Sequence, residues 1–335
     1  MSLTLPKQYH SPLEGRETET AIKFIRDTFQ KQLTEALHLQ RISAPLFVRP
    51  ETGLNDDLNG VERPVRFDVP AIGGANVEIV HSLAKWKRMT LGKYKFPAGE
   101  GLYTDMNAIR RDEELDNLHS MYVDQWDWEA VIEKKDRTME TLKAYVRKIY
   151  QALLDTQEAV CGKYPALQNY FPKEITFITS QELEDLYPEF TPKERENRIA
   201  REKKAVFLMQ IGGKLESGEK HDGRAPDYDD WQLNGDIIIY YPILDTAFEI
   251  SSMGIRVDED ALRAQVKEAD CEKRLALPFH QMLLEKKLPY TIGGGIGQSR
   301  LCMLMLGKAH IGEVQASVWS DEMLEVCAQH GMELL

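Results

Sequence analysis

Two carboxylates in apolar surroundings are the first residues of this chain that suggest chemistry. Asp236 lies in the predicted strand 234–241, and Glu249 lies in the predicted strand 246–257. A carboxylate in such surroundings is costly unless it is paired with a cation or bound to a metal ion. Mg²⁺ binds one or two carboxylates and otherwise takes water and phosphate oxygens. The pair therefore indicates either a site for magnesium and a polyphosphate or a structural salt bridge.

A second candidate site lies on the predicted strand 119–129. Strand alternation places an amide and two carboxylates on one face, namely Gln125, Asp127 and Glu129. The opposite face carries two tryptophans, which indicates that the strand is packed on that side. Arg110 ends the neighbouring predicted strand 101–110. The polar face therefore either lines a cavity or forms ordinary cross-strand pairs in solvent.

A glycine-rich segment, Gly293–Gly297, precedes the predicted helix 298–306. It is not a Walker A loop, because no Gly-Lys-Ser/Thr follows, and Arg300 stands where a dinucleotide fingerprint needs its last glycine. Glycines allow a backbone to approach a flat or charged ligand closely, and Arg300 could stack on a base or pair with phosphate. The alternative is a tight strand-to-helix turn followed by a surface arginine.

Two shorter segments supply charges of opposite sign. The stretch 81–88 predicts a short basic helix, 83–91, with Ser82 as its N-cap. The stretch 224–231 is a polar, turn-like loop with three aspartates, and acids in such a loop are usually solvated. An amino-acid substrate would need both kinds of group, an acid for its ammonium and a cation for its carboxylate.

The elements that must position these residues predict an α+β fold. Apolar periodicity predicts helices over 16–39, 83–91, 134–160, 259–268, 278–287, 298–306 and 321–330. The predicted strands are 41–48, broken by Pro45, and 65–70, 76–81, 101–110, 119–129, 234–241, 246–257 and 311–319. A loop over 49–64 and a strand–helix–helix–strand unit over 174–212 complete the pattern. Runs of adjacent strands between long helices indicate a mainly antiparallel sheet flanked by helices, and we expect a single domain over 1–335.

Composition narrows the class of protein. The chain has 335 residues, a net charge of −12 and a pI near 5.3, which disfavours broad binding to nucleic acid. Its four cysteines are far apart in sequence and indicate free thiols rather than a metal site or disulfides. No signal peptide or apolar run long enough to span a bilayer is evident, so we expect a cytoplasmic protein without a membrane partner.

Taken together, these segments resemble asparagine synthetase A, the family of ammonia-dependent aspartate ligases. The matching stretches are HSLAKWKR at 81–88, GEGLYTDMNAIR at 99–110, YVDQWDWE at 122–129, RAPDYDDW at 224–231, LNGD at 233–236, EISSMGIR at 249–256, GGGIGQSR at 293–300 and HIGEVQA at 310–316. They span nearly the whole chain in the family's order. The resemblance implies a catalytic core similar to that of class II aminoacyl-tRNA synthetases. In that core the helix and strand of 16–48 build the interface of a homodimer.

The resemblance also implies the reaction. The β-carboxylate of L-aspartate attacks the α-phosphate of ATP and releases pyrophosphate, and ammonia then displaces AMP from the β-aspartyl-adenylate to give L-asparagine. Glutamine-dependent synthetases use an N-terminal cysteine, whereas this chain starts Met1-Ser2 and has its first cysteine at 161. We therefore expect free ammonia as the nitrogen donor.

Residue by residue, the resemblance assigns two neighbouring subsites. Residues for ATP are Arg110, Asp236, Glu249, Ser252 and Arg300, of which Asp236 and Glu249 also bind Mg²⁺. Residues for aspartate are Asp56, Lys87, Gln125, Asp127, Asp229 and Arg256. Arg110, Asp56, Asp229 and Gln125 are the catalytic candidates, and the general base is left open between Asp56 and Asp229. Two rival functions also stay open at this point, a tRNA-charging enzyme and a catalytically inactive sensor of amino acids.

Overall fold

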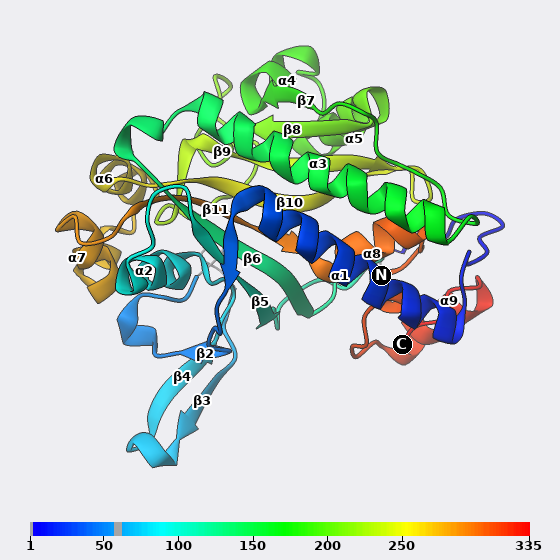
Figure 1. Ribbon diagram of the computed structural model, residues 1–335, viewed down its shortest axis with the longest axis horizontal. Coiled ribbons are helices and arrows are strands. Elements are labelled where there is room, and N and C mark those ends of the chain that lie inside the picture. The colour runs from blue at the N-terminus through cyan, green and yellow to red at the C-terminus, as the bar shows by residue number, and fades with distance from the viewer. Residues whose placement is uncertain (1–2, 57–61) are drawn as a thin grey trace.

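A mixed β-sheet runs through the centre of the computed structural model, which describes residues 3–56 and 62–335 (Figure 1). Within these residues the sheet has eight strands, in the order β1-β5-β6-β11-β10-β9-β8-β7. Their bounds are β1 Leu39–Arg41, β5 Gly101–Ile109, β6 Tyr122–Ile132, β11 Tyr290–Gly297, β10 Thr246–Arg256, β9 Asp229–Tyr241, β8 Ala205–Met209 and β7 Thr176–Thr179. Only the outer pairs β1–β5 and β7–β8 are parallel in this described sheet. The predicted α+β fold with a mainly antiparallel sheet is confirmed.

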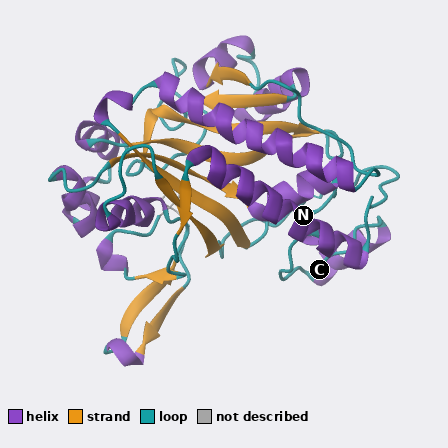
Figure 2. Ribbon diagram, in the orientation of Figure 1, coloured by secondary structure: helices purple, strands orange, loops and turns teal. Residues whose placement is uncertain are grey.

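Two long helices, α1 and α3, lie side by side across one face of the sheet (Figures 1 and 2). The α-helices have the bounds α1 Gly15–Leu37, α2 Ala84–Tyr94, α3 Met139–Lys163, α4 Ser180–Leu186, α5 Pro192–Lys203, α6 Glu259–Glu268, α7 Pro278–Leu284, α8 Gln298–Leu306 and α9 Asp321–Gln329. In the part of the chain that the structure describes, no helix is both long and apolar enough to cross a membrane.

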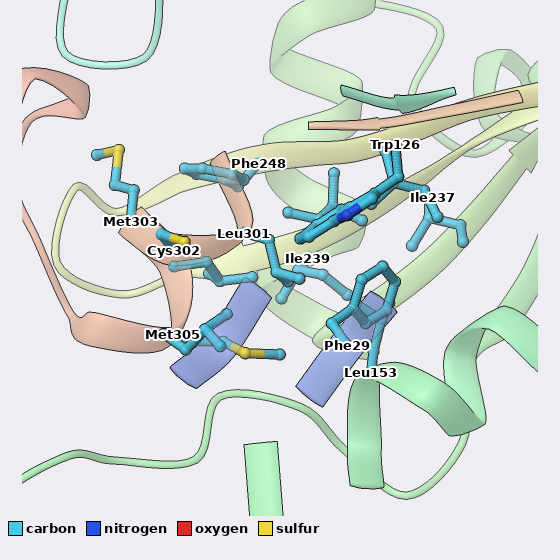
Figure 3. Close-up of a cluster of buried hydrophobic side chains, with 14 of the residues drawn as sticks. Phe29, Trp126, Leu153, Ile237, Ile239, Phe248, Leu301, Cys302, Met303 and Met305 are labelled. Atoms are coloured by element: carbon cyan, nitrogen blue, oxygen red, sulfur yellow. The ribbon is translucent and has the colours of Figure 1, made fainter. Parts of the chain in front are cut away.

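The main core lies between the sheet and the layer formed by α1, α3 and α8. Figure 3 shows side chains from these elements meeting there, namely Phe29, Trp126, Leu153, Ile237, Ile239 and Leu301. The rings of Phe29 and Trp126 lie 4.9 Å apart between centroids. Because side chains alternate along β6, its tryptophans enter this core while Gln125, Asp127 and Glu129 face the other way. One face of the sheet is thus sealed by these helices. The other face is covered by α4 and α5 only near β7, β8, β9 and the start of β10, which leaves room for a site elsewhere on it.

A small antiparallel sheet projects from the body of the molecule (Figure 1). It consists of β2 (Phe47–Val48), β4 (Ala75–Ile79) and β3 (Arg66–Val69). We call the described residues between 46 and 79 the arm. The predicted strand 41–48 is therefore divided between two sheets, with β1 in the large sheet and β2 in the arm. Pro45 lies between them, where its missing N–H interrupts no ladder.

Several predicted boundaries are wrong for local reasons. Helix α3 begins at Met139 rather than at 134, because Thr138 caps it by accepting a hydrogen bond from the Thr141 N–H (3.2 Å). The segment Lys134–Asp136 is instead a 3₁₀ turn, η3. Helix α2 begins at Ala84 with Leu83 rather than Ser82 as N-cap, although the Ala84 N–H still donates to Ser82 Oγ. Helix α7 ends at Leu284 rather than at 287.

The predicted strand 311–319 is also wrong. Ile311–Glu313 forms a 3₁₀ turn, η5, and the residues after it have no regular structure. Residues 311–315 are buried by the surrounding protein rather than by a sheet, and an apolar run alone cannot distinguish the two. Three further 3₁₀ turns occur in the described residues, at η1 Pro50–Thr52, η2 Pro70–Ile72 and η4 Glu272–Ala276. The predicted loop 49–64 contains η1, and its residues 57–61 lie outside the described part.

Candidate active site

A cavity of about 460 Å³ lies on the face of the sheet that α1 and α3 leave free. Most of the predicted site residues line it: Asp56, Arg110, Gln125, Asp127, Asp229, Glu249, Ser252, Arg256 and Arg300. Lys87 and Asp236 stand behind its wall, each in contact with a lining residue. Positions spread over some 245 residues of sequence thus converge on one cleft.

The floor of the cavity is held by a buried guanidinium. Arg256, on β10, donates from Nη2 to Glu129 Oε2 (2.7 Å) and from Nε to both oxygens of Glu129 (3.0 and 3.1 Å). Its Nη1 donates to Asp229, at the start of β9. Thr291 Oγ1 adds a hydrogen bond of 2.7 Å to Glu129. Burial opposes the charge of Glu129, but Arg256 and Lys87 outweigh it and lower the pKa of this carboxyl.

Lys87 extends the same network from helix α2. Its ammonium is fully buried, contacts the Asp127 carboxylate, donates to the Trp128 carbonyl (2.8 Å) and lies 3.7 Å from Glu129. Burial lowers the pKa of Lys87 and raises that of Asp127, while their contact opposes both shifts. Among the described residues, the second oxygen of Asp127, Oδ2, is buried without a hydrogen-bond partner. Because Asp127 lines the cavity, this oxygen is a candidate acceptor for a ligand.

The glycine-rich segment makes room for these charges. It is strand β11, at the middle of the sheet, and not the turn that was the alternative interpretation. A Cβ added to Gly293 would come within 3.0 Å of Glu129 and Arg256, and one added to Gly295 would come equally close to Gln125. Glycine is needed here for the close approach of neighbouring side chains rather than for an unusual backbone angle.

A second cluster of charged side chains lies farther along the same strands. Arg224 Nη2 donates to Asp236 Oδ1 (2.6 Å), and its Nη1 donates to Ser252 Oγ. Burial, together with the charge of Glu249, raises the pKa of Asp236 to about 7, although Arg224 opposes this shift. The structural salt bridge considered for Asp236 is thus present, with Arg224 as its partner. This partner was missed in the sequence, although it begins the matched stretch 224–231.

A β-bulge brings the remaining acid to the same side of the sheet. Asp236 is opposite Ser252, and Ile238 is opposite Glu249, so Ile250 is the additional residue in β10. Without this bulge Glu249 and Ser252 would point to opposite faces, because side chains alternate along a strand. The bulge therefore allows both to line the cavity.

Two arginines frame this end of the cavity. Arg300, in the first turn of α8, donates from Nη1 to the Glu249 carbonyl (3.1 Å) and lies 3.9 Å from the Glu249 carboxylate. Arg110 follows β5 and lies 3.7 Å from Glu113, and its Nε is buried with no hydrogen-bond partner in residues 3–56 and 62–335. Both guanidinium groups retain donors for an anionic ligand.

The expectation that the three aspartates of 224–231 are solvated is wrong. All three are buried, and Asp227 is bound by Lys85 Nζ (3.0 Å) and His280 Nε2 (2.9 Å) and lies 3.3 Å from Arg274. These partners overcome burial and lower the pKa of Asp227. Asp227 thereby ties the loop to α2 and α7, which fixes Arg224 and Asp229 on either side of it.

Comparison with known proteins identifies the family. A family model described as aspartate–ammonia ligase matches residues 16–331. A curated aspartate–ammonia ligase from Ruminiclostridium cellulolyticum is 66% identical over 334 residues, which cover 100% of this chain and 99% of the relative. One from Clostridium tetani is 63% identical and covers 99% of this chain and 98% of the relative. The chain belongs to the aspartate–ammonia ligase family.

Solved structures place this ligase on a shared fold. Asparaginyl-tRNA synthetase from Pyrococcus horikoshii, solved with asparaginyl-adenylate, matches with a TM-score of 0.63 at 14% identity, over 90% of this chain and 70% of that chain. The Entamoeba histolytica asparaginyl-tRNA synthetase matches with a TM-score of 0.62 at 13% identity, over 90% and 67%. The predicted class II aminoacyl-tRNA synthetase-like core is therefore confirmed at the level of the fold.

The magnesium expected for this family is compatible with the residues present. Within the described ranges no three His, Cys, Asp or Glu side chains gather into a site that could hold a metal alone. Asp236 and Glu249 offer two carboxylates on one face, and Mg²⁺ takes its remaining ligands from water and phosphate. Burial and the nearby charge of Glu249 raise the pKa of Asp236, and a divalent cation would favour its charged form.

The buried network of the ligase predicts a large loss of stability in Arg256→Met. This change leaves Glu129 and Asp229 buried without their guanidinium partner, so we expect the free energy of unfolding to fall by about 3–5 kcal/mol. Urea unfolding followed by tryptophan fluorescence measures it. The control is Arg201→Met, which breaks an exposed pair with Asp245 and should change stability by less than about 1 kcal/mol. Equal effects of the two variants would contradict the interpretation.

Proposed function

We infer that the chain is an enzyme that converts L-aspartate, ammonia and ATP into L-asparagine, AMP and pyrophosphate. Family membership over the whole chain carries this conclusion. The cavity supports it, because it has a cationic end suited to a nucleotide and a buried acid–base network suited to an amino acid. ATP serves as co-substrate, and the intermediate is β-aspartyl-adenylate.

The chemistry requires two anions to approach each other. The aspartate β-carboxylate attacks the α-phosphorus of ATP, a bond to the β-phosphate oxygen breaks, and pyrophosphate leaves. Ammonia then attacks the activated carbonyl carbon, and AMP leaves. A carboxylate is a poor acyl donor until adenylation supplies a good leaving group. The protein contributes by holding both anions in place and by offsetting their repulsion with fixed positive charge.

We assign aspartate to the end of the cavity above Arg256. The residues proposed for it are Asp56, Lys87, Gln125, Asp127, Asp229 and Arg256. Asp229 and the open oxygen of Asp127 can accept hydrogen bonds from the substrate ammonium. Arg256 supplies the fixed positive charge of this end, and Lys87 acts from behind the wall by orienting Asp127. Gln125 is an uncharged donor and acceptor between the two ends.

We assign ATP to the other end. The residues proposed for it are Arg110, Arg224, Asp236, Glu249, Ser252 and Arg300. Arg110 and Arg300 would hold phosphates and adenine, and Arg224 would orient Asp236 and Ser252. Asp236 and Glu249 would hold Mg²⁺, which when bound neutralises phosphate charge and favours departure of pyrophosphate.

Product analysis separates this function from its rivals. Purified protein with aspartate, ATP and Mg²⁺ should form asparagine and AMP in a one-to-one ratio when ammonium is added, and markedly less with glutamine. A tRNA-charging enzyme would instead transfer aspartate to added tRNA, and an amino-acid sensor would bind aspartate without consuming ATP. Failure to form asparagine from ammonium would contradict the proposal.

Arg110→Ala should lower turnover by about two to three orders of magnitude, the usual scale for losing one preorganised charge partner. The reason is that Arg110 lines the cavity and its Nε has no hydrogen-bond partner among the described residues. Initial rates of AMP formation at saturating substrates measure the change. Arg198→Ala, on α5 and away from the cavity lining, is the matched control and should keep normal turnover. Near-normal activity of Arg110→Ala would remove this residue from the mechanism.

Asp236→Asn should raise the Mg²⁺ concentration that gives half-maximal rate by about tenfold or more, the scale on which changes near a metal alter its affinity. The substitution keeps the shape of the side chain and removes its charge. Magnesium titrations at fixed, saturating ATP measure the shift. Asp245→Asn, an exposed acid at the far end of the β9–β10 hairpin, is the control. An unchanged titration in Asp236→Asn speaks against the metal assignment.

We further propose that the chain forms a homodimer through residues 16–48. The inner side of α1 is buried, whereas two large apolar residues at the end of this segment, Leu46 and Phe47, are 47% and 45% exposed. Phe47 packs against Phe67 of the arm, with ring centroids 5.6 Å apart. Adjoining apolar side chains in water are typical of an interface.

Phe47→Glu should then weaken the dimer by about 2 kcal/mol or more, because it places a charge where an aromatic anchor is buried. Sedimentation equilibrium over a range of concentrations measures the dissociation constant. Leu186→Glu changes an apolar residue of α4 that is 57% exposed and lies outside 16–48, and should leave the dimer intact. A monomeric parent protein, or an unchanged constant in Phe47→Glu, counts against this interface.

A further inference from the structure

One histidine in the cavity wall, His81, is not among the residues proposed to bind ATP or aspartate. His81 follows β4 and begins the turn that leads into α2. It is only 1% exposed, yet it lines the cavity together with Asp56, Gln125 and Asp229. Its backbone N–H donates to Asn55 Oδ1 (2.9 Å), which holds the residue in place from the neighbouring loop.

The contacts of the His81 ring define its tautomer. Nδ1 lies 3.0 Å from the backbone carbonyl oxygen of Asp56, and a carbonyl oxygen can only accept a hydrogen bond. Nδ1 therefore carries the proton, and Nε2 of the neutral ring presents a lone pair. In the described part of the chain Nε2 is buried and has no hydrogen-bond partner. A buried acceptor without a partner is costly, so its presence in a cavity wall points to a ligand that donates to it.

Two acids that share the cavity, Asp229 and Asp127, are less suited to take up a proton. Asp229 contacts the Arg256 guanidinium, and Asp127 contacts the Lys87 ammonium. Protonating either carboxylate would remove one of the counter-charges of a buried cation. His81 faces no such penalty from an ion pair, and the unprotonated nitrogen of a neutral imidazole can accept a proton.

We propose that His81 Nε2 is the general base of the amination step, an inference that rests on the proposed function. The ammonia lone pair forms a bond to the β-carbonyl carbon of the adenylate, and the carbonyl π-pair moves onto oxygen. Nε2 takes one proton from the positively charged nitrogen of this adduct. The pair on oxygen then reforms the carbonyl, the bond from carbon to the phosphate oxygen breaks, and AMP leaves. The His81 imidazolium returns its proton to solvent. Before attack, the same lone pair orients ammonia by accepting one of its hydrogens.

The two half-reactions allow His81 to be tested apart from the rest of the site. His81→Asn places an amide N–H near the position of Nδ1, so it can keep the bond to Asp56 while removing Nε2. Aspartate-dependent exchange of pyrophosphate into ATP reports adenylation, and asparagine formation from ammonium reports the whole reaction. We expect exchange to stay within about threefold of the parent and ammonia-dependent turnover to fall by about 10²–10⁴-fold. His81→Gln, which lacks a basic nitrogen, should behave in the same way and serves if His81→Asn does not fold.

Hydroxylamine provides a second measurement that a merely structural role would not change. It is less basic than ammonia, so its adduct loses a proton without strong help from a base. The deficit of His81→Asn should therefore be at least tenfold smaller with hydroxylamine than with ammonium. His330→Asn, an exposed histidine that ends α9, is the control and should match the parent in every assay.

The outcomes distinguish this inference from the proposed function. If the parent protein shows no aspartate-dependent exchange and forms no asparagine, the proposed function fails. If the parent is active and the His81 variants keep normal amination, the general base is elsewhere. If exchange and amination fall together, or if hydroxylamine and ammonium show the same deficit, His81 supports the site only structurally and the inference is overturned.

Discussion

The buried ion network around Arg256 is the constraint on which the rest of the structure depends. Isolated charges at this depth would be unstable, so Arg256, Glu129, Asp229 and Lys87 must be placed together with little freedom. The central strand β11 meets this requirement because it has glycine, Gly293, where the side chains of Glu129 and Arg256 come closest to its backbone. Because the network is fixed before substrate arrives, its groups need little reorganisation when the charged amino acid binds.

The layered fold separates stability from chemistry. One face of the sheet is buried by α1, α3 and α8, whereas the other carries the cavity, and alternation along β6 separates Trp126 and Trp128 from Gln125, Asp127 and Glu129 accordingly. The bulge at Ile250 interrupts the regular alternation along β10 and turns Glu249 toward the cavity. Rigid strands, rather than loops, hold most of the charged groups, which suits a reaction that depends on the exact separation of two anions.

The likeness to tRNA synthetases concerns the fold, at 13–14% identity, and does not by itself extend to the substrate. Family membership, at 60–66% identity over essentially the full chain, is a different kind of relation and bears on the reaction. An inactive sensor is a poor explanation of the cavity, because an amino-acid receptor has no need of the second charged group around Asp236 and Arg224. The concentration of both charged groups in one cleft is what an adenylating enzyme requires.

The sequence by itself determined the class of fold, the order of most elements and nine of the residues that line the cavity, because strand alternation, glycine content and the series of matched stretches are local properties of the chain. It did not reveal Arg224 as the partner of Asp236, the burial of the three aspartates, or the ring nitrogen of His81 that has no hydrogen-bond partner in the described part of the chain. Those depend on which segments meet across the sheet, as does the difference between a buried strand and a buried turn at 311–319. Tertiary structure decided them, since the ionic and hydrogen-bond partners of a buried group come from residues far away in sequence.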